Sequence, residues 1–159
     1  PPRVLEAKRE LGVAVHAATE LDDLDELDDL ETDPRVMGYV RAWRRFKADT
    51  GAEVLMTEQR LYSSALRFAG TLDGVVRVRS GEVYLVDRKT SVAMPWSYGV
   101  QLAGYQLLLD ESAFSTRLER KGVRLSADGT YKLVPYNNPN DEPCFRALLA
   151  IYNWKESNR

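Results

Sequence analysis

The chain is poor in the residues that most often build covalent or metal cross-links: its 159 residues include one cysteine, Cys144, and one histidine, His16. A single cysteine excludes an internal disulfide and any zinc or iron–sulfur site made only of this chain's cysteines, and it fits a reducing cytoplasm. No apolar run approaches the length of a membrane span, and no signal-peptide pattern opens the sequence. The chain begins Pro1-Pro2 without methionine, so we expect a trimmed N-terminus.

An excess of positive charge is also missing, since the formal net charge is -2. Residues 20–33 hold nine acidic residues and no basic one, so the other 15 of the 24 acidic residues face all 22 basic residues. Positive charge kept apart from one acidic segment still attracts phosphate within a Debye length of about 8–10 Å. Charge therefore does not exclude a nucleic acid. The acidic segment itself can mimic DNA over a cleft, bind cations weakly or keep the chain in solution, and the last is favoured.

Length and composition predict one domain over residues 1–159, with 44% hydrophobic and 29% charged residues. The order of elements predicts an α/β (α+β) fold, a central mixed β-sheet flanked by helices. The expected helices cover residues 3–19, 34–50, 97–111 and 141–155, and the expected strands cover 52–62, 67–79, 82–89 and a hairpin over 120–136.

Local signals support two of these helices. Asp33 followed by Pro34 is typical of an N-cap with proline at the first helical position, and Gly51 predicts the end of the same helix. In the last helix, apolar residues at helical spacing are expected to pack inward. They are Phe145, Leu148, Leu149, Ile151 and Tyr152.

The strand over 82–89 carries the residues of greatest chemical interest. Alternate side chains share a face, so Asp87 and Lys89 address the same volume. Asp73 on the preceding strand can join them only in one register. A two-residue turn at 80–81 would place Asp73 opposite the residue after Asp87 and send its side chain to the wrong face. The site therefore requires a three-residue loop, or a bulge for which Gly74 is well placed.

In that register the side chains of Asp73 and Asp87, with the backbone carbonyl of Arg88, supply the hard oxygen ligands that Mg²⁺ prefers. Lys89 is then placed to position or deprotonate an attacking water, or to offset charge at a phosphorus atom. This chemistry is metal-assisted hydrolysis of a phosphodiester. The alternative is that Asp-x-Lys at a strand end forms only a solvated ion pair.

These residues have companions in a fixed order, and together the chain resembles the PD-(D/E)xK nuclease superfamily, most closely its RecB-like and phage exonuclease branch. The resemblance covers roughly residues 12–110. It implies a restriction-endonuclease-like core and a Mg²⁺- or Mn²⁺-dependent deoxyribonuclease. We expect an exonuclease of phage or bacterial recombination and repair, in the cytoplasm of a bacterial cell or a phage-infected host. A catalytically inactive domain of the same fold, binding nucleic acid or a protein partner, is the alternative.

The resemblance also assigns roles to four residues outside the strand. It implies that His16 places its imidazole on the metal, and that Glu58 is an additional acid that binds a second metal or orients water. Gln101 and Tyr105, four apart and therefore on one helix face, resemble a motif that steers the DNA backbone and supports the catalytic Lys89. Without the family, His16 is a packed or surface residue, Glu58 an exposed strand residue, and Tyr105 a core residue beside Gln101.

The sequence departs from the family in three places. The acid before x-Lys is aspartate, Asp87, where glutamate is commoner, and the RecB-like branch uses this variant. No proline precedes Asp73. The cysteines that hold an iron–sulfur cluster in some relatives are absent, which disfavours those subfamilies.

Three further residues are candidates for contact with DNA. Trp96 lies in a proline-containing loop after the catalytic strand and is suited to stack on an unpaired base, although a hydrophobic plug under that loop is the alternative. Arg44 and Arg45 can contact phosphates, although a charged helix face is often only solvated. No helix presents base-reading side chains, so we expect no sequence specificity. A recombination or annealing protein as partner and a homo-oligomer are left open.

Overall fold

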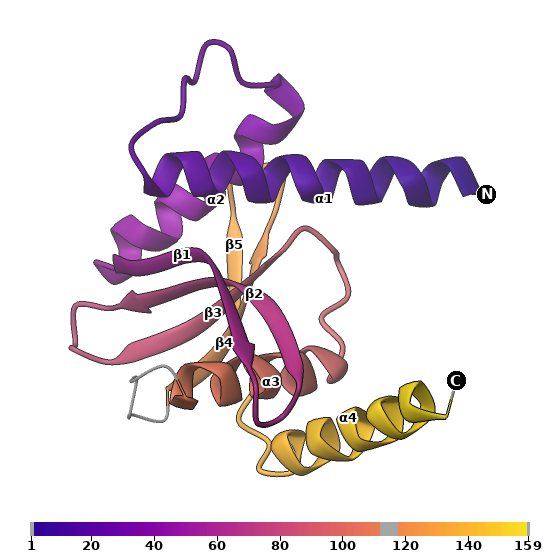
Figure 1. The fold of residues 1–159 in the computed structure, drawn as a ribbon. Helices are drawn as coiled ribbons and strands as arrows, with labels where there is room; N and C mark the ends of the chain where they lie inside the picture. Colours follow the sequence, from indigo (N-terminus) through magenta and orange to yellow (C-terminus); the bar gives the residue numbers. More distant parts are fainter. Residues whose placement is uncertain (1, 112–117, 159) are drawn as a thin grey trace.

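The computed structural model describes residues 2–111 and 118–158 (Figure 1). Over these residues it contains four helices: α1 Pro2–Asp23, α2 Pro34–Thr50, α3 Ser97–Glu111 and α4 Asp141–Ser157. The five strands are β1 Glu53–Ser63, β2 Phe68–Arg77, β3 Val83–Lys89, β4 Glu119–Leu125 and β5 Tyr131–Pro135. Among the described residues, no helix combines the length and the apolar character that crossing a bilayer requires.

The strands form one sheet in the order β1-β2-β3-β4-β5. β3 and β4 are parallel, and the chain passes between them through α3, while the other neighbouring pairs are antiparallel. A parallel pair needs such a crossover, because a short turn cannot bring the chain back to the same end of the sheet. The predicted α+β class, with a mixed sheet flanked by helices, is confirmed.

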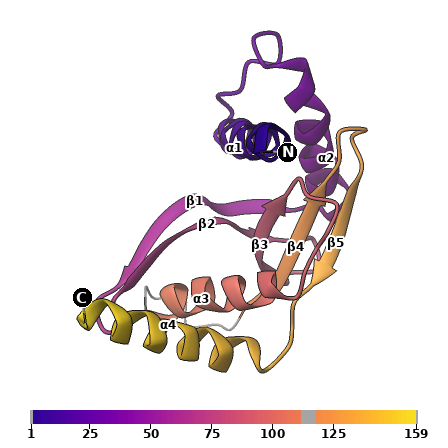
Figure 2. The same ribbon diagram turned by 90° about the vertical axis from the view of Figure 1, so that its right-hand side faces the viewer.

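Helices cover both faces of this sheet (Figure 2). Successive strand residues point to opposite faces. Val76 and Val86 accordingly pack with α1 and α2, whereas Val75 and Leu85 pack with α3. α4 lies outside α3 and forms an outer layer (Figure 2). The sheet is therefore buried between two apolar clusters, one on each side.

The local signals for α2 are confirmed. The Asp33 side chain accepts a hydrogen bond of 2.8 Å from the backbone N–H of Arg35, and Gly51 ends the helix with a φ of 63°. α1 differs from expectation, because it continues past residue 19 to Asp23. The acidic residues of this last turn do not all face solvent: the side chains of Asp22 and Asp23 are 7% and 1% exposed and pair with cations.

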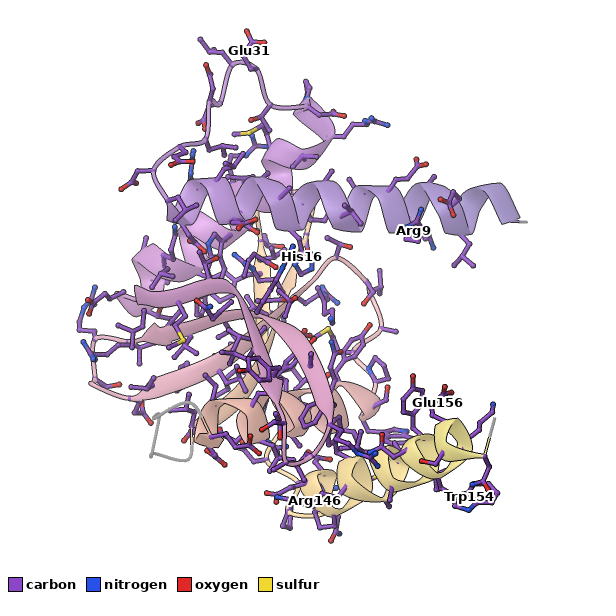
Figure 3. The ribbon with its side chains drawn as sticks, in the orientation of Figure 1. Arg9, His16, Glu31, Arg146, Trp154 and Glu156 are labelled. Atoms are coloured by element: carbon purple, nitrogen blue, oxygen red, sulfur yellow. The ribbon has the colours of Figure 1, made fainter. Side chains whose placement is uncertain are left out.

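The expectation for α4 is wrong in part. Leu148, Ile151 and Tyr152 are 56%, 63% and 60% exposed, although their spacing predicts a buried stripe. α4 contacts the body of the protein along a narrower face, where the Phe145 ring lies 5.0 Å from the ring of Phe68. The side of α4 that faces away from α3 is not covered by any other element of the described chain. Trp154 lies on this outer side and points away from the protein (Figure 3).

Candidate metal centre

The β2–β3 hairpin has the register that the predicted site requires. The Val78 N–H donates to the Glu82 carbonyl over 2.9 Å, which closes a three-residue loop over residues 79–81. With this loop, the ladder that pairs Gly74 with Val86 places Asp73 opposite Asp87 when continued by one residue. The two carboxylates therefore come from facing positions of neighbouring strands. The sequence offered a three-residue loop or a bulge at Gly74, and the three-residue loop is what sets this register.

The two strands separate at this point. Their pairing ends at Gly74 and Val86, and the far half of the β1–β2 hairpin bends away from β3 (Figure 2). The Arg88 N–H, which would otherwise continue the ladder, donates instead to Asp73 Oδ2 over 2.6 Å. The Asp73 carboxylate thus lies in the gap between β2 and β3, where groups from either face of the sheet can reach it.

His16 on α1 reaches this gap and completes a cluster of three possible metal ligands. Its side chain points from α1 toward the sheet (Figure 3). Nδ1 of His16 lies 3.4 Å from Glu58 Oε1 and 3.6 Å from Asp73 Oδ2. One ligand atom from each of His16, Glu58 and Asp73 lies within 4.8 Å of the others. A helix and two strands therefore bring together three residues that the sequence separates by 15 to 57 positions.

Glu58 reaches the cluster with an unusual backbone. Its φ is 42°, a left-handed value that a non-glycine residue seldom adopts inside a strand. Its neighbours Thr57 and Gln59 are paired with β2 on either side, so the sheet holds Glu58 in this conformation. Backbone strain of this kind persists only where the surroundings impose it, and it is common at ligand sites.

The charges of the cluster act on one another. Burial lowers the pKa of His16, but the hydrogen bond to Glu58 and the charge of Asp73 outweigh burial and raise that pKa above its ordinary value. Burial raises the pKa of Glu58, but the hydrogen bond with His16 and the charge of Arg88 bring that pKa below its ordinary value. Glu58 is therefore anionic at neutral pH and is available to a cation.

Asp87 and Lys89 form a pair beside the cluster. Lys89 Nζ donates to Asp87 Oδ1 over 2.8 Å, while Asp87 Oδ2 is buried without a hydrogen-bond partner in the described structure. Burial, and then the charge of Asp73, raise the pKa of Asp87 to about 6. Burial lowers the pKa of Lys89, but the charge and hydrogen bond of Asp87 outweigh it and keep that pKa above its ordinary value. Lys89 is accordingly an ammonium ion at neutral pH, which favours a role in positioning or charge compensation over one as a base.

Sequence reasoning assigned only the backbone carbonyl of Arg88 to the site and missed its side chain. The guanidinium is 1% exposed, and its Nη2 donates to Glu58 Oε1 over 2.9 Å and to the Asp73 carbonyl over 2.7 Å. Its Nη1 donates to Asp23 Oδ2 over 3.0 Å. Alternation along β3 was the available signal, because it sends the Arg88 side chain to the face opposite Asp87, where α1 and α2 lie.

The predicted pair on α3 lies on one helix face, as its spacing requires. Gln101 Nε2 donates to Tyr105 Oη over 2.8 Å. Tyr105 is partly buried and packs against the apolar cluster under α3, so the core interpretation accounts for its ring. A Cβ atom at Gly70 would lie 2.9 Å from Tyr105 Cε1, which explains the glycine at that position of β2. Burial raises the pKa of Tyr105, and its hydroxyl remains a hydrogen-bond donor.

A surface cavity of about 560 Å³ adjoins the cluster. Residues of α1, β1, β3, the following loop and the start of α3 line it; they include Arg9, His16, Glu58, Lys89 and Tyr98. Trp96 is outside this lining and is 77% exposed. The alternative of a hydrophobic plug is therefore wrong for Trp96, and its ring is accessible to a stacking partner.

The two arginines predicted to contact phosphate lie elsewhere. Arg44 makes a two-pronged ion pair with Asp29, with both distances 2.7 Å, and a second pair with Asp22. A phosphate would have to displace these carboxylates. Arg45 is more accessible, with a side chain 61% exposed and 3.6 Å from Asp49, but neither arginine lines the cavity beside the metal cluster.

The residues of the cluster fit a divalent cation of the Mg²⁺ or Mn²⁺ type. Two carboxylates and one imidazole supply oxygen and nitrogen donors, and the imidazole favours Mn²⁺ tolerance. The unpartnered, buried Asp87 Oδ2 beside them is the kind of atom that a cation would satisfy. Asp87 itself is outside the tight cluster of His16, Glu58 and Asp73.

No protein-family model matches the chain, and no curated protein matches it.

Proposed function

We propose that this protein is a Mg²⁺- or Mn²⁺-dependent deoxyribonuclease with a restriction-endonuclease-like core. The observation that carries the proposal is the convergence of His16, Glu58 and Asp73 within 4.8 Å, beside the buried pair of Asp87 and Lys89. A solvated ion pair at a strand end would be exposed, whereas Asp87 is 0% exposed and the Lys89 side chain 19% exposed. Burying charges in this way is costly unless they are paired or bind a cation.

Each residue has a distinct task in this proposal. His16, Glu58, Asp73 and Asp87, with the Arg88 carbonyl, would hold the cation. When bound, the cation supplies positive charge at the phosphate and lowers the pKa of water. The Lys89 ammonium donates hydrogen bonds toward the reacting phosphate and offsets the negative charge that grows there.

The pair on α3 has a supporting task. Gln101 and Tyr105 are hydrogen-bonded to each other, and burial, with smaller contributions from the charges of Asp73 and Asp87, raises the pKa of Tyr105. We assign the two side chains to orienting the DNA backbone, and Trp96 to stacking on an unpaired base. The motif order that resembles RecB-like and phage enzymes favours exonuclease action in recombination or repair, in a bacterial or phage-infected cytoplasm.

End-labelled linear DNA and closed circular DNA, each incubated with Mg²⁺, Mn²⁺ or EDTA, test this proposal. We expect metal-dependent loss of linear DNA and survival of the closed circle. Asp87→Ala and Lys89→Ala should each abolish the loss. Degradation that persists in both variants, or that resists EDTA, would contradict the proposal. A wild-type protein that binds DNA without cutting it would instead indicate an inactive domain of the same fold.

A further inference from the structure

The Arg88 guanidinium is the most connected buried charge beside the cluster. It is 1% exposed and contacts residues of two helices and two strands. Its partners are Asp23, Trp43, Thr57, Glu58 and the Asp73 carbonyl. The planar fork of an arginine can hold several acceptors at fixed angles, which a lysine cannot do. Arg88 thus links the end of α1, α2 and the β1–β2 hairpin to β3.

Two of the three cluster ligands take their orientation from this one residue. Nη2 of Arg88 holds the Glu58 carboxylate at 2.9 Å and the Asp73 carbonyl at 2.7 Å. The backbone N–H of Arg88 holds the Asp73 carboxylate at 2.6 Å. The strand ladders hold the backbone on either side of Glu58 but include neither Glu58 nor Asp73 as a paired residue, so strand pairing does not orient these two side chains. Arg88 replaces the missing constraint at both positions.

A lone guanidinium at this place would neutralise the ligands and weaken their attraction for a cation. Asp23 prevents this, because its carboxylate is 1% exposed and lies 3.0 Å from Arg88 Nη1. Lys47 Nζ lies 2.9 Å from a carboxylate oxygen of both Asp22 and Asp23, and its positive charge offsets the negative charge of these two residues. The negative charges of Glu58 and Asp73 are therefore held in place and left for a divalent cation.

We propose that Arg88 is a positioning residue, whose side chain presents Glu58 and Asp73 to the metal while Asp23 balances its charge. The inference rests on the proposed function, since it concerns the same metal. Outer groups that orient metal ligands typically change metal affinity by about 10- to 100-fold when removed. A purely structural arginine would change stability and leave the intrinsic metal affinity of the folded protein as it is.

Two variants separate these roles, with Mn²⁺ affinity measured by isothermal titration calorimetry and stability by thermal unfolding in EDTA. Arg88→Met removes a cation that pairs with the buried Asp23 carboxylate and leaves Lys47 beside it, so it should lower stability and weaken Mn²⁺ binding by about 10- to 100-fold. The double variant Asp23→Asn/Arg88→Met removes both charges and should regain stability, but its Mn²⁺ affinity should stay at least about 10-fold below wild type.

Arg120→Met is the matched control. Arg120 is also buried and lies 3.0 Å from an aspartate, Asp141, and its guanidinium donates to the carbonyls of Gly99 and Asn138 over 3.1 Å each. It should lose stability and keep wild-type Mn²⁺ affinity. Should both Arg88 variants fail to fold, Thr57→Val removes the hydroxyl that accepts from Arg88 Nη2 and donates to Asp23 Oδ2, and it should weaken Mn²⁺ binding by about 2- to 10-fold.

The outcomes are distinct. Wild-type affinity in Arg88→Met or in Thr57→Val would overturn the inference and leave the proposed function standing. Recovery of Mn²⁺ affinity together with stability in the double variant would also overturn it, because the role would then be structural. A wild-type protein that binds no Mn²⁺ would defeat the proposed function itself, and the inference with it.

Discussion

Replacing Asp87 with asparagine should stabilise the metal-free protein at neutral pH. Asp87 is 0% exposed, and its Oδ2 has no hydrogen-bond partner in the described structure. Burial and the charge of Asp73 raise its pKa from 3.8 to about 6. Each step of one in pKa corresponds to about 1.36 kcal/mol, so the ionised carboxylate lowers the free energy of unfolding by about 3 kcal/mol.

The sign follows from linkage. A carboxyl whose pKa is higher in the folded state than in the unfolded state binds more protons when folded, so stability falls as pH rises. The cost is absent below about pH 4 and complete above about pH 6. Asp87→Asn mimics the protonated form, so its advantage over wild type should be near zero at pH 4 and about 3 kcal/mol at pH 8.

Urea unfolding in EDTA between pH 4 and pH 8 measures this difference. In thermal unfolding the same advantage corresponds to a rise in Tm of about 6–12 °C. Asp49→Asn, which removes a half-exposed carboxylate on α2, is the control and should change stability by less than about 0.5 kcal/mol at either pH. A variant at position 87 that is less stable than wild type at pH 8, or whose advantage does not depend on pH, would refute the reasoning.

Three other outcomes follow from the same structure. Glu58→Gln should lower the pKa of His16, which NMR in EDTA can measure on the chain's one imidazole signal. The raised pKa of His16 stabilises the fold below about pH 6.5, and this stabilisation disappears as the pH rises through that pKa. The variant should therefore lose stability chiefly at low pH. Trp96→Ala should weaken binding of a fluorescent single-stranded oligonucleotide by about 1–3 kcal/mol without lowering Tm; equal affinity would exclude stacking. Leu148→Ser should change the free energy of unfolding by less than about 0.5 kcal/mol in urea, and a loss above about 2 kcal/mol would mean that the outer side of α4 is buried.

The elements of the fold were predictable where the signal was local. Asp33, Pro34 and Gly51 mark the ends of α2 because capping and left-handed geometry depend on a few neighbouring residues. The register of the β2–β3 hairpin was also accessible, since only one placement of Asp73 brings it opposite Asp87. For residues far apart in sequence, such as His16 and Glu58, the prediction that they meet at one site came only from the family resemblance.

Two features were not predictable in the same way. The apolar spacing of α4 indicates a stripe, but spacing cannot tell whether another layer covers Leu148 and Ile151. The favoured role of the acidic segment was to keep the chain in solution, yet Asp23 is buried, because its partners Lys47 and Arg88 come from other elements, 24 and 65 positions away. Such long-range pairs leave no periodic signature in one sequence, and the role of the Arg88 side chain was missed for the same reason.

Electron spin-echo spectroscopy of the Mn²⁺-loaded protein tests the central claim most directly, because the chain contains a single histidine. We predict a nitrogen coupling from the His16 imidazole to the bound ion, lost in His16→Gln, and weakened Mn²⁺ binding in Asp73→Asn. Mn²⁺ bound without that coupling, or a coupling unchanged in His16→Gln, would contradict a metal held between α1 and the gap in the sheet.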